Sequence, residues 1–298
     1  MIEAYWIIGG MAAVAGVASL LGYVLARRHP GSAAVENLNA RVRSWWVLIV
    51  VGGAALLLGR IAILVLFAGL SFQGLREFLK TDRPVRWLCF YVLLPVQYVL
   101  IGFGWSGTFA IWIPVCGLIG IAVVGLFGGT ERFLDRVAVT QWGMMVCLFG
   151  LSHIPALMML RISEERSELL MVFVVLIAQV SDIMQYVWGK LIGRHALVPT
   201  LSPSKTVEGL LGGVLSASLL GACLWRITPF TFVQAGLMAL LIATFGFLGG
   251  LVMSAIKRDR GIKDWGGLLE GHGGILDRID SLCFSAPVFF YVTRYFFG

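Results

Sequence analysis

Charged residues are scarce in this chain. Asp, Glu, Lys and Arg make up 13% of its 298 residues, whereas a soluble domain has about 25%. Hydrophobic residues make up 59%, and the mean hydropathy is +0.90. One soluble core of this size cannot hold so much apolar surface, so the composition predicts a membrane protein.

Linkers and processing signals are also missing. No Pro- or Ser-rich linker, charge block or low-complexity tract divides the sequence, which favours one membrane domain. The start MIEAYW has neither the basic flank nor the cleavage site of a signal peptide, so we expect the first apolar segment to remain. The cysteines have no spacing typical of zinc sites or disulfides, and we interpret them as packing residues.

Apolar segments of membrane-spanning length recur along the chain. A span needs roughly 20 apolar residues, and eight segments are clear: 5–26, 87–103, 107–127, 141–160, 169–189, 209–226, 231–253 and 282–297. The region 44–80 has two interpretations. A single span would place Arg60 in mid-membrane at a cost of about 2.5–3.5 kcal/mol. A hairpin of 44–59 and 61–79 would turn at Gly59 and Arg60.

The distribution of basic residues favours the hairpin. Cytoplasmic loops are enriched in Lys and Arg. With the hairpin, 18 of the 23 basic residues share one side of the membrane, whereas a single span gives 14. We therefore predict an all-α, polytopic helical bundle of nine to ten transmembrane helices, with ten favoured and both termini outside. The membrane also accounts for the net charge of +7 without a nucleic-acid partner.

We expect three regions along the chain. Residues 1–43 would add an N-terminal transmembrane segment and a basic loop, 44–168 would form the membrane scaffold, and 169–298 would carry the catalytic loops. Most of the 37 glycines are interpreted as helix-packing residues, because small residues let membrane helices approach closely.

The loop before the last span breaks the apolar pattern. Residues 254–280 read SAIKRDRGIKDWGGLLEGHGGILDRID and mix basic with acidic side chains. Charges of both signs suit a ligand such as a phosphate–metal complex. Asp277 and Asp280 are three positions apart, so they share a face at the start of the last helix. Their oxygens suit Mg²⁺, which often binds one or two carboxylates together with phosphate and water.

Two glycines, Gly273 and Gly274, directly precede that helix. Glycine lets the backbone approach a ligand closely, and the free N–H groups at a helix start bind phosphate. His272 beside them could donate to a phosphate oxygen or transfer a proton. Taken alone, His272 would more simply be a hydrogen-bonded loop histidine.

A second polar loop, residues 189–209, reads GKLIGRHALVPTLSPSKTVEG. Ser202, Ser204, Lys205 and Thr206 offer three hydroxyls and an ammonium, which suit phosphates. Taken alone, they are more simply a helix N-cap and an interfacial lysine. Upstream, Asp182 lies in the inner half of the 169–189 span. An acid at that depth is costly and predicts a functional site, with Lys205 or a shared metal as its partner.

At these two loops the chain resembles the phosphatidate cytidylyltransferases, or CDP-diacylglycerol synthases. Their signature of Ser-x-apolar-Lys-Arg, four residues, Lys-Asp and then His-Gly-Gly-x-x-Asp-Arg-x-Asp is matched from Ser254 to Asp280. Their Ser-Pro-x-Lys-Thr-x-x-Gly loop is matched from Ser202 to Gly209. The resemblance covers about 180–281, and before it only Arg76-Glu-Phe78 is similar.

The chain departs from the family's pattern at two places. Glu270 stands where the family has Pro or Gly, two residues before the signature histidine. Met184 and Gln185 follow the membrane aspartate, where the family has small residues and Ala-Tyr. The reaction type is therefore transferred more safely than the lipid substrate.

The resemblance implies that phosphatidate and CTP give CDP-diacylglycerol and pyrophosphate, in phospholipid biosynthesis at the cytoplasmic face of a bacterial inner membrane. It implies Mg²⁺ as cofactor, with a second metal ion left open. The implied metal ligands are Asp264, Asp277, Asp280 and Asp182. The implied catalytic residues are Lys205, Lys257, Arg258, Lys263, His272 and Arg278. The implied substrate-binding residues are Ser202, Ser204, Thr206, Gly273 and Gly274.

Other interpretations stay open. The chain could be a CTP-dependent transferase or kinase for another lipid or isoprenoid, or a transporter or non-catalytic paralogue. A transporter would show inverted repeats with broken helices, and none is visible in the sequence. A non-catalytic paralogue would lack signature carboxylates or lysines, and none is missing. The expected partners are CTP, a lipid phosphate and the bilayer. The preferred acyl chains and headgroup, and whether the chain forms a homodimer, are left open.

Overall fold

The computed structural model describes residues 2–28, 31–79, 83–160, 162, 164–199, 201–267 and 273–297. The described chain is almost entirely helical and contains one two-stranded antiparallel hairpin. Its elements are α1 (Ile2–Arg28), α2 (Ala33–Leu58), α3 (Arg60–Phe78), α4 (Arg83–Leu88), η1 (Cys89–Leu93), α5 (Leu94–Phe103), α6 (Ser106–Ile111), η2 (Trp112–Gly117), α7 (Leu118–Gly125), η3 (Leu126–Gly128), α8 (Phe133–Gly143), η4 (Met144–Gly150), α9 (Leu151–Ala156), η5 (Leu157–Met159), α10 (Glu164–Ile192), β1 (Ala196–Val198), β2 (Ser202–Thr206), α11 (Val207–Cys223), η6 (Trp225–Ile227), α12 (Phe232–Asp259) and α13 (Leu276–Phe297).

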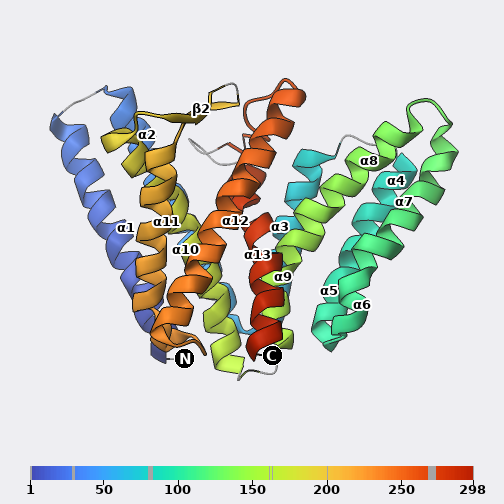
Figure 1. Cartoon of the computed structure of the whole chain (residues 1–298), viewed down its shortest axis with the longest axis horizontal. Coiled ribbons are helices and arrows are strands. Elements are labelled where there is room, and N and C mark those ends of the chain that lie inside the picture. The colour runs from blue at the N-terminus through green and yellow to red at the C-terminus, as the bar shows by residue number, and fades with distance from the viewer. Residues whose placement is uncertain are drawn as a thin grey trace.

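The ten expected spans are all helical, and the prediction of an all-α polytopic membrane protein is confirmed. Among the described residues, six helices are long and apolar enough to cross a membrane: Arg60–Phe78, Arg83–Phe103, Ser106–Gly128, Phe133–Met159, Arg166–Ile192 and Phe232–Asp259. Trp45–Leu58 and Val207–Cys223 are shorter apolar helices. Both termini lie at the end opposite the β-hairpin, as an even number of crossings requires (Figure 1).

The helical structure is interrupted between α2 and α3 at Gly59. Its φ of 84° is readily adopted only by glycine. The two helices pack against each other, so the hairpin interpretation of residues 44–80 is correct. The Arg60 guanidinium donates to the carbonyls of Ile101 and Gly102, both at 3.1 Å, at the end of α5. Arg60 therefore lies at a helix end with partners, not unpaired in mid-membrane. The expected region boundary at 43/44 falls inside α2, and the division into three regions remains a prediction.

Three spans contain a π-helical segment, namely η1, η2 and η4. Pro95 follows η1 and Pro114 lies within η2, and proline removes a backbone donor from the helix. A π-turn accommodates the interruption. Between two of these spans, the Trp112 indole donates to the Leu93 carbonyl at 3.1 Å.

Small residues bring α11 close to its neighbours. Gly209, Gly213, Ala217 and Gly221 recur every four residues and are buried. A Cβ at Gly209 would lie 2.8 Å from the carbonyl oxygen of Gln185 on α10, so only glycine allows this approach. The unusual Gln185 is thus a packing residue between α10 and α11.

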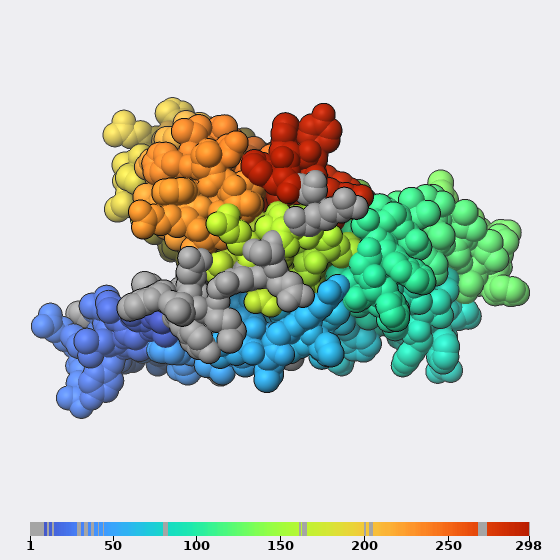
Figure 2. Space-filling view, turned by 90° about the horizontal axis from the view of Figure 1, so that it is seen from below, coloured from blue at the N-terminus to red at the C-terminus, as the bar shows by residue number. Residues whose placement is uncertain are grey.

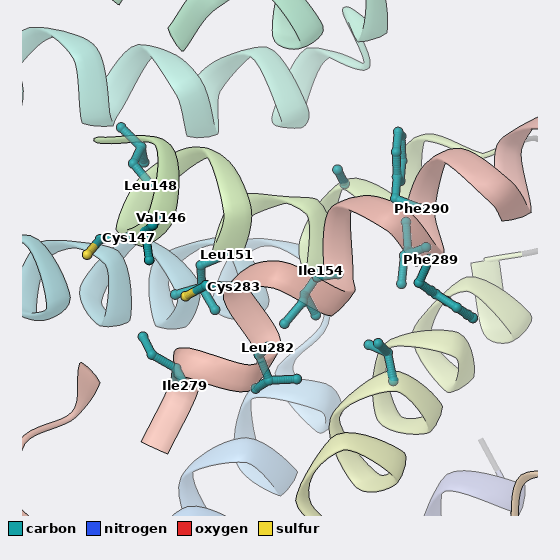
Figure 3. Packing of buried hydrophobic residues seen from close by; sticks show 14 of the residues in the cluster. Val146, Cys147, Leu148, Leu151, Ile154, Ile279, Leu282, Cys283, Phe289 and Phe290 are labelled. Atoms are coloured by element: carbon teal, nitrogen blue, oxygen red, sulfur yellow. The ribbon is translucent and has the colours of Figure 1, made fainter. Parts of the chain in front are cut away.

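The core lies where α13 packs against η4 and α9. Figure 3 shows Leu151 and Ile154 of α9 lying beside Leu282 and Cys283 of α13. These side chains are at most 4% exposed, so they fix α13 along its length. Seen from the end that holds the termini, α1 projects on one side and the α5–α7 region on the other (Figure 2).

Candidate active site

The first turn of α13 lies deeper in the bundle than the C-terminal end of α12 (Figure 1). Asp277 joins these two helix ends. Lys257 Nζ donates to Asp277 Oδ1 at 2.8 Å, and the side chains are 14% and 5% exposed. Asp277 Oδ2 accepts from the N–H groups of Trp265 at 2.8 Å and Gly274 at 3.0 Å. Three donors therefore hold this carboxylate in one orientation.

Gly273 lies directly beside that carboxylate. Its φ is 79°, and a Cβ there would approach Asp277 Oδ2 to 2.8 Å. The same Cβ would lie 3.3 Å from Asp264 Cβ, which places Asp264 next to the start of α13. Asp264 and Lys263 are exposed, as is Arg258 in the last turn of α12. Of these three exposed residues, only Asp264 has a described contact at the start of α13.

Lys205 reaches the site from the β-hairpin. In that hairpin Ala196 pairs with Thr206, and Val198 pairs with Ser202. The Lys205 ammonium lies 4.9 Å from the centre of the Phe247 ring on α12. It is also 3.1 Å from where a Cβ on Gly250 would be. The absence of a side chain at Gly250 thus leaves room for the Lys205 side chain to pass along the surface of α12.

The motif that contains Lys205 is also fastened to α11. The Thr206 hydroxyl accepts the N–H of Gly209 at 3.1 Å, so Thr206 is the N-cap of α11. Glu208 accepts from the N–H of Arg194 at 3.1 Å and of His195 at 3.2 Å. Its other oxygen bonds His195 Nδ1. These bonds fix the hairpin that presents Lys205.

The carboxylates of Asp182 and Asp280 lie within electrostatic range of each other and of Lys205. Asp182 is exposed although it lies in the middle of α10, so its carboxylate faces an accessible space. Gln179, one turn earlier, donates to the Arg278 carbonyl at 3.1 Å and ties α10 to α13. Burial lowers the pKa of the Lys205 ammonium, and the two carboxylates oppose that shift.

The structure thus brings together five of the predicted residues: Asp182, Lys205, Lys257, Asp277 and Asp280. Arg278 lies on the same turn of α13 and within electrostatic range of Asp182. Ser202 lies in β2, half-buried. The predictions for His272, Glu270 and the Ser204 side chain lie outside what the structure describes.

Comparison with known proteins identifies the family. Residues 39–296 match the Cytidylyltransferase family. The chain belongs to that family. It is 42% identical over 284 residues to the uncharacterized protein YnbB of Escherichia coli, covering 94% of each chain.

Two relatives have a named activity. The chain is 34% identical over 184 residues to a phosphatidate cytidylyltransferase of Staphylococcus epidermidis, covering 59% of this chain and 69% of the relative. It is 32% identical over 182 residues to that of Staphylococcus aureus, with the same shares. This cytidylyltransferase is therefore a membrane nucleotidyltransferase of lipid biosynthesis that uses CTP, as the resemblance implied.

In the part of the chain that the structure describes, the cytidylyltransferase site offers carboxylate oxygens to a cation but no preformed cage. Among the described residues, no three His, Cys, Asp or Glu side chains group closely enough to hold a metal ion. Asp277 already accepts bonds from three donors. Asp182 and Asp280 remain as a pair of carboxylates, which fits an ion that takes its other ligands from phosphate and water.

One carboxylate of the cytidylyltransferase site was not among the predicted site residues. Glu77, in the last turn of α3, accepts from the N–H groups of Ile275 at 3.1 Å and Leu276 at 2.9 Å. It is the only acidic residue of α3, and it lies in the Arg76-Glu-Phe78 segment that resembles the family. These two signals could have identified it. We expected the N–H groups at the start of α13 to bind phosphate. Instead, those of Ile275 and Leu276 donate to Glu77, and that of Gly274 donates to Asp277.

Arg260 and two stacked aromatic rings lie next to Glu77. Arg260 Nη1 donates to the Phe78 carbonyl at 2.6 Å. Its guanidinium lies 4.1 Å from the Phe78 ring centre and 5.3 Å from that of Trp265. Phe78 and Trp265 stack with their centres 5.0 Å apart. The end of α3 is thus fixed to the loop between α12 and α13.

Proposed function

We propose that this cytidylyltransferase transfers the cytidylyl group of CTP to the phosphate of phosphatidate, giving CDP-diacylglycerol and pyrophosphate, at the cytoplasmic face of a bacterial inner membrane. One observation carries the proposal. Lys205, from the motif Ser202 to Gly209, lies within electrostatic range of Asp182, Asp280 and Lys257. Cations and carboxylates from separate segments therefore converge at one place, where phosphates of a lipid and of a nucleotide could meet.

In the proposed reaction an oxygen of the lipid phosphate forms a bond to the α-phosphorus of CTP. The bond from that phosphorus to the oxygen bridging the β-phosphorus breaks, and pyrophosphate leaves with the electron pair. A phosphate monoester is largely ionised at pH 7, since its second pKa is about 6. No general base is needed, so His272 is proposed as a donor to phosphate.

Both reactants are anions, so the enzyme must position them and offset their charge. We assign Lys205 and Lys257 to the phosphates at the reacting centre, since both are partly buried and held by neighbouring carboxylates. Arg258 and Lys263, which are exposed, would attract the triphosphate. Mg²⁺ held by Asp182 and Asp280 would neutralise charge on the phosphate oxygens.

The depth of α13 supports a lipid substrate. Asp277 and Asp280 lie in the recessed first turns of that helix (Figure 1). A phosphate on a membrane lipid could reach this level from the bilayer while CTP enters from water. This arrangement favours transfer between a soluble nucleotide and a membrane-bound acceptor.

Pyrophosphate release tests the proposal. Purified protein in detergent receives CTP and Mg²⁺ with phosphatidate, lysophosphatidate, a polyprenyl phosphate or diacylglycerol. We expect release with phosphatidate above the other three and none without lipid. Release with the polyprenyl phosphate alone would assign a different acceptor. A protein that is inactive with all four would contradict the proposal.

A further inference from the structure

The N–H groups at the start of α13 are satisfied by a side chain 198 residues earlier in the chain. A helix leaves its first N–H groups without intrahelical partners, and a preceding side chain usually caps them. The residues before α13 are Gly273, Gly274 and Ile275, which have no such side chain. Glu77 of α3 supplies the cap through its bonds to Ile275 and Leu276.

The Glu77 carboxylate occupies space that two glycines leave open. A Cβ on Gly274 would overlap Glu77 Oε2, and a Cβ on Gly266 would lie 3.2 Å from Oε1. Gln73 Nε2 donates to Oε1 at 3.1 Å, which orients the carboxylate from its own helix. Glu77 is therefore enclosed by residues on both sides of the loop between α12 and α13.

The consequence for the site follows from the position of α13. Its first two turns carry Asp277 and Asp280, and Asp277 in turn holds Lys257. A shift at the start of this helix moves the carboxylates relative to Lys205. Because the helix start is already occupied by carboxylates, lysine side chains rather than these N–H groups must bind the substrate phosphates.

We propose that Glu77 is a positioning residue for the cytidylyl transfer, which acts by setting the start of α13. This inference rests on the proposed function, since its kinetic test requires that reaction. The inference gives α3 a role in the site, through a residue that belongs to neither loop motif. Glu77 acts through the backbone of α13, not on substrate.

Glu77→Gln and Glu77→Asp test the inference, with Glu131→Gln, an exposed loop residue, as control. The amide of Gln keeps one acceptor and turns an NH₂ group toward a backbone N–H. We expect kcat to fall about 10- to 100-fold, as for a misplacement near 1 Å, while the KM for CTP changes far less. Asp keeps the charge but is shorter, so its loss of kcat should be smaller.

Hydrogen–deuterium exchange gives a readout that is independent of turnover. We expect faster exchange of the amides at 275–277 in Glu77→Gln, with unchanged exchange in α10 and an unchanged thermal midpoint. Wild-type kcat in Glu77→Gln would overturn the inference, and so would a loss of kcat without faster exchange at 275–277. If the Gln variant does not fold, the same criteria apply to Glu77→Asp. If the wild-type protein transfers no cytidylyl group, the proposed function fails, and the exchange rates still decide whether Glu77 sets α13.

Discussion

Lys257 Nζ lies 2.8 Å from Asp277 Oδ1, in a pair that is almost completely buried. The pair connects the last turn of α12 to the first turn of α13, twenty residues apart. An ion pair with so little access to water has two effects. It fixes one ammonium at the candidate site, and it penalises the loss of either partner.

Lys257→Met should both destabilise and inactivate the enzyme. The substitution leaves the Asp277 carboxylate buried without its cation, which costs on the order of 3–5 kcal/mol. Adding Asp277→Asn removes that charge and should restore much of the stability without restoring activity. Thermal unfolding in detergent and pyrophosphate release measure the two effects. Equal stability of the single and double variants would show that the pair is not coupled.

Asp182→Asn should abolish turnover with little loss of folded protein. The residue is exposed in the second half of α10, and the neutral amide adds no unpaired charge. It does remove one carboxylate from the pair that we assign to Mg²⁺. Asp135→Asn is the matched control, because Asp135 is exposed and pairs with the exposed Arg132 at 3.2 Å. Activity of Asp182→Asn within a few-fold of wild type would remove Asp182 from the site.

Substitutions at Gly250 should act through Lys205. A Cβ there lies 3.1 Å from the Lys205 ammonium, so Ala should displace the flexible lysine slightly and Val should displace it further. We expect a few-fold loss of kcat/KM in Gly250→Ala and a loss of about tenfold or more in Gly250→Val. Gly69→Ala, where a Cβ meets nothing within 4 Å, serves as control. Wild-type kinetics in Gly250→Val would place Lys205 outside the reaction.

The pH dependence of activity should report Lys205. Burial lowers the pKa of this ammonium, so activity that needs its charge should fall with rising pH below the usual range of lysine. Arginine stays charged to higher pH, and Lys205→Arg should therefore move the alkaline fall in kcat/KM upward. An alkaline limb that is unchanged in Lys205→Arg would assign it to another group.

Stability should respond to pH in the opposite sense. Between the folded and the unfolded pKa of Lys205, the unfolded state binds more protons than the folded state. The contribution of Lys205 to the free energy of unfolding therefore rises with pH as the buried ammonium is lost. Unfolding of wild type and Lys205→Met over that alkaline range measures the contribution by difference.

Much of the fold could be predicted because the membrane imposes a single length scale. Segments of about 20 apolar residues identify the spans, and the bias of Lys and Arg resolved the hairpin around Arg60. The π-turns could not be predicted from hydropathy. They depend on local backbone features, such as the donors that Pro95 and Pro114 remove, which the hydropathy of a whole span does not report.

The candidate site was predictable where its residues share a motif, and at Asp182 because an acid at that depth of a span is costly. Asp277 and Asp280 were recognised by their spacing, and Lys205 by its loop. Glu77 contacts the same helix start from 198 residues away, a separation that no local spacing reveals. Thr206 shows the opposite outcome, since the simpler interpretation of a helix cap proved correct for its hydroxyl.

Transfer of label from CTP to phosphatidate is the most direct test of the account. Purified protein is incubated with Mg²⁺, phosphatidate and CTP that is labelled at either the α- or the γ-phosphorus, and the lipids are then extracted. We predict that the α-label enters the lipid fraction as CDP-diacylglycerol and that the γ-label leaves as pyrophosphate, and that both events stop in Asp182→Asn. Entry of the γ-label into lipid, or no transfer of the α-label, would contradict the account.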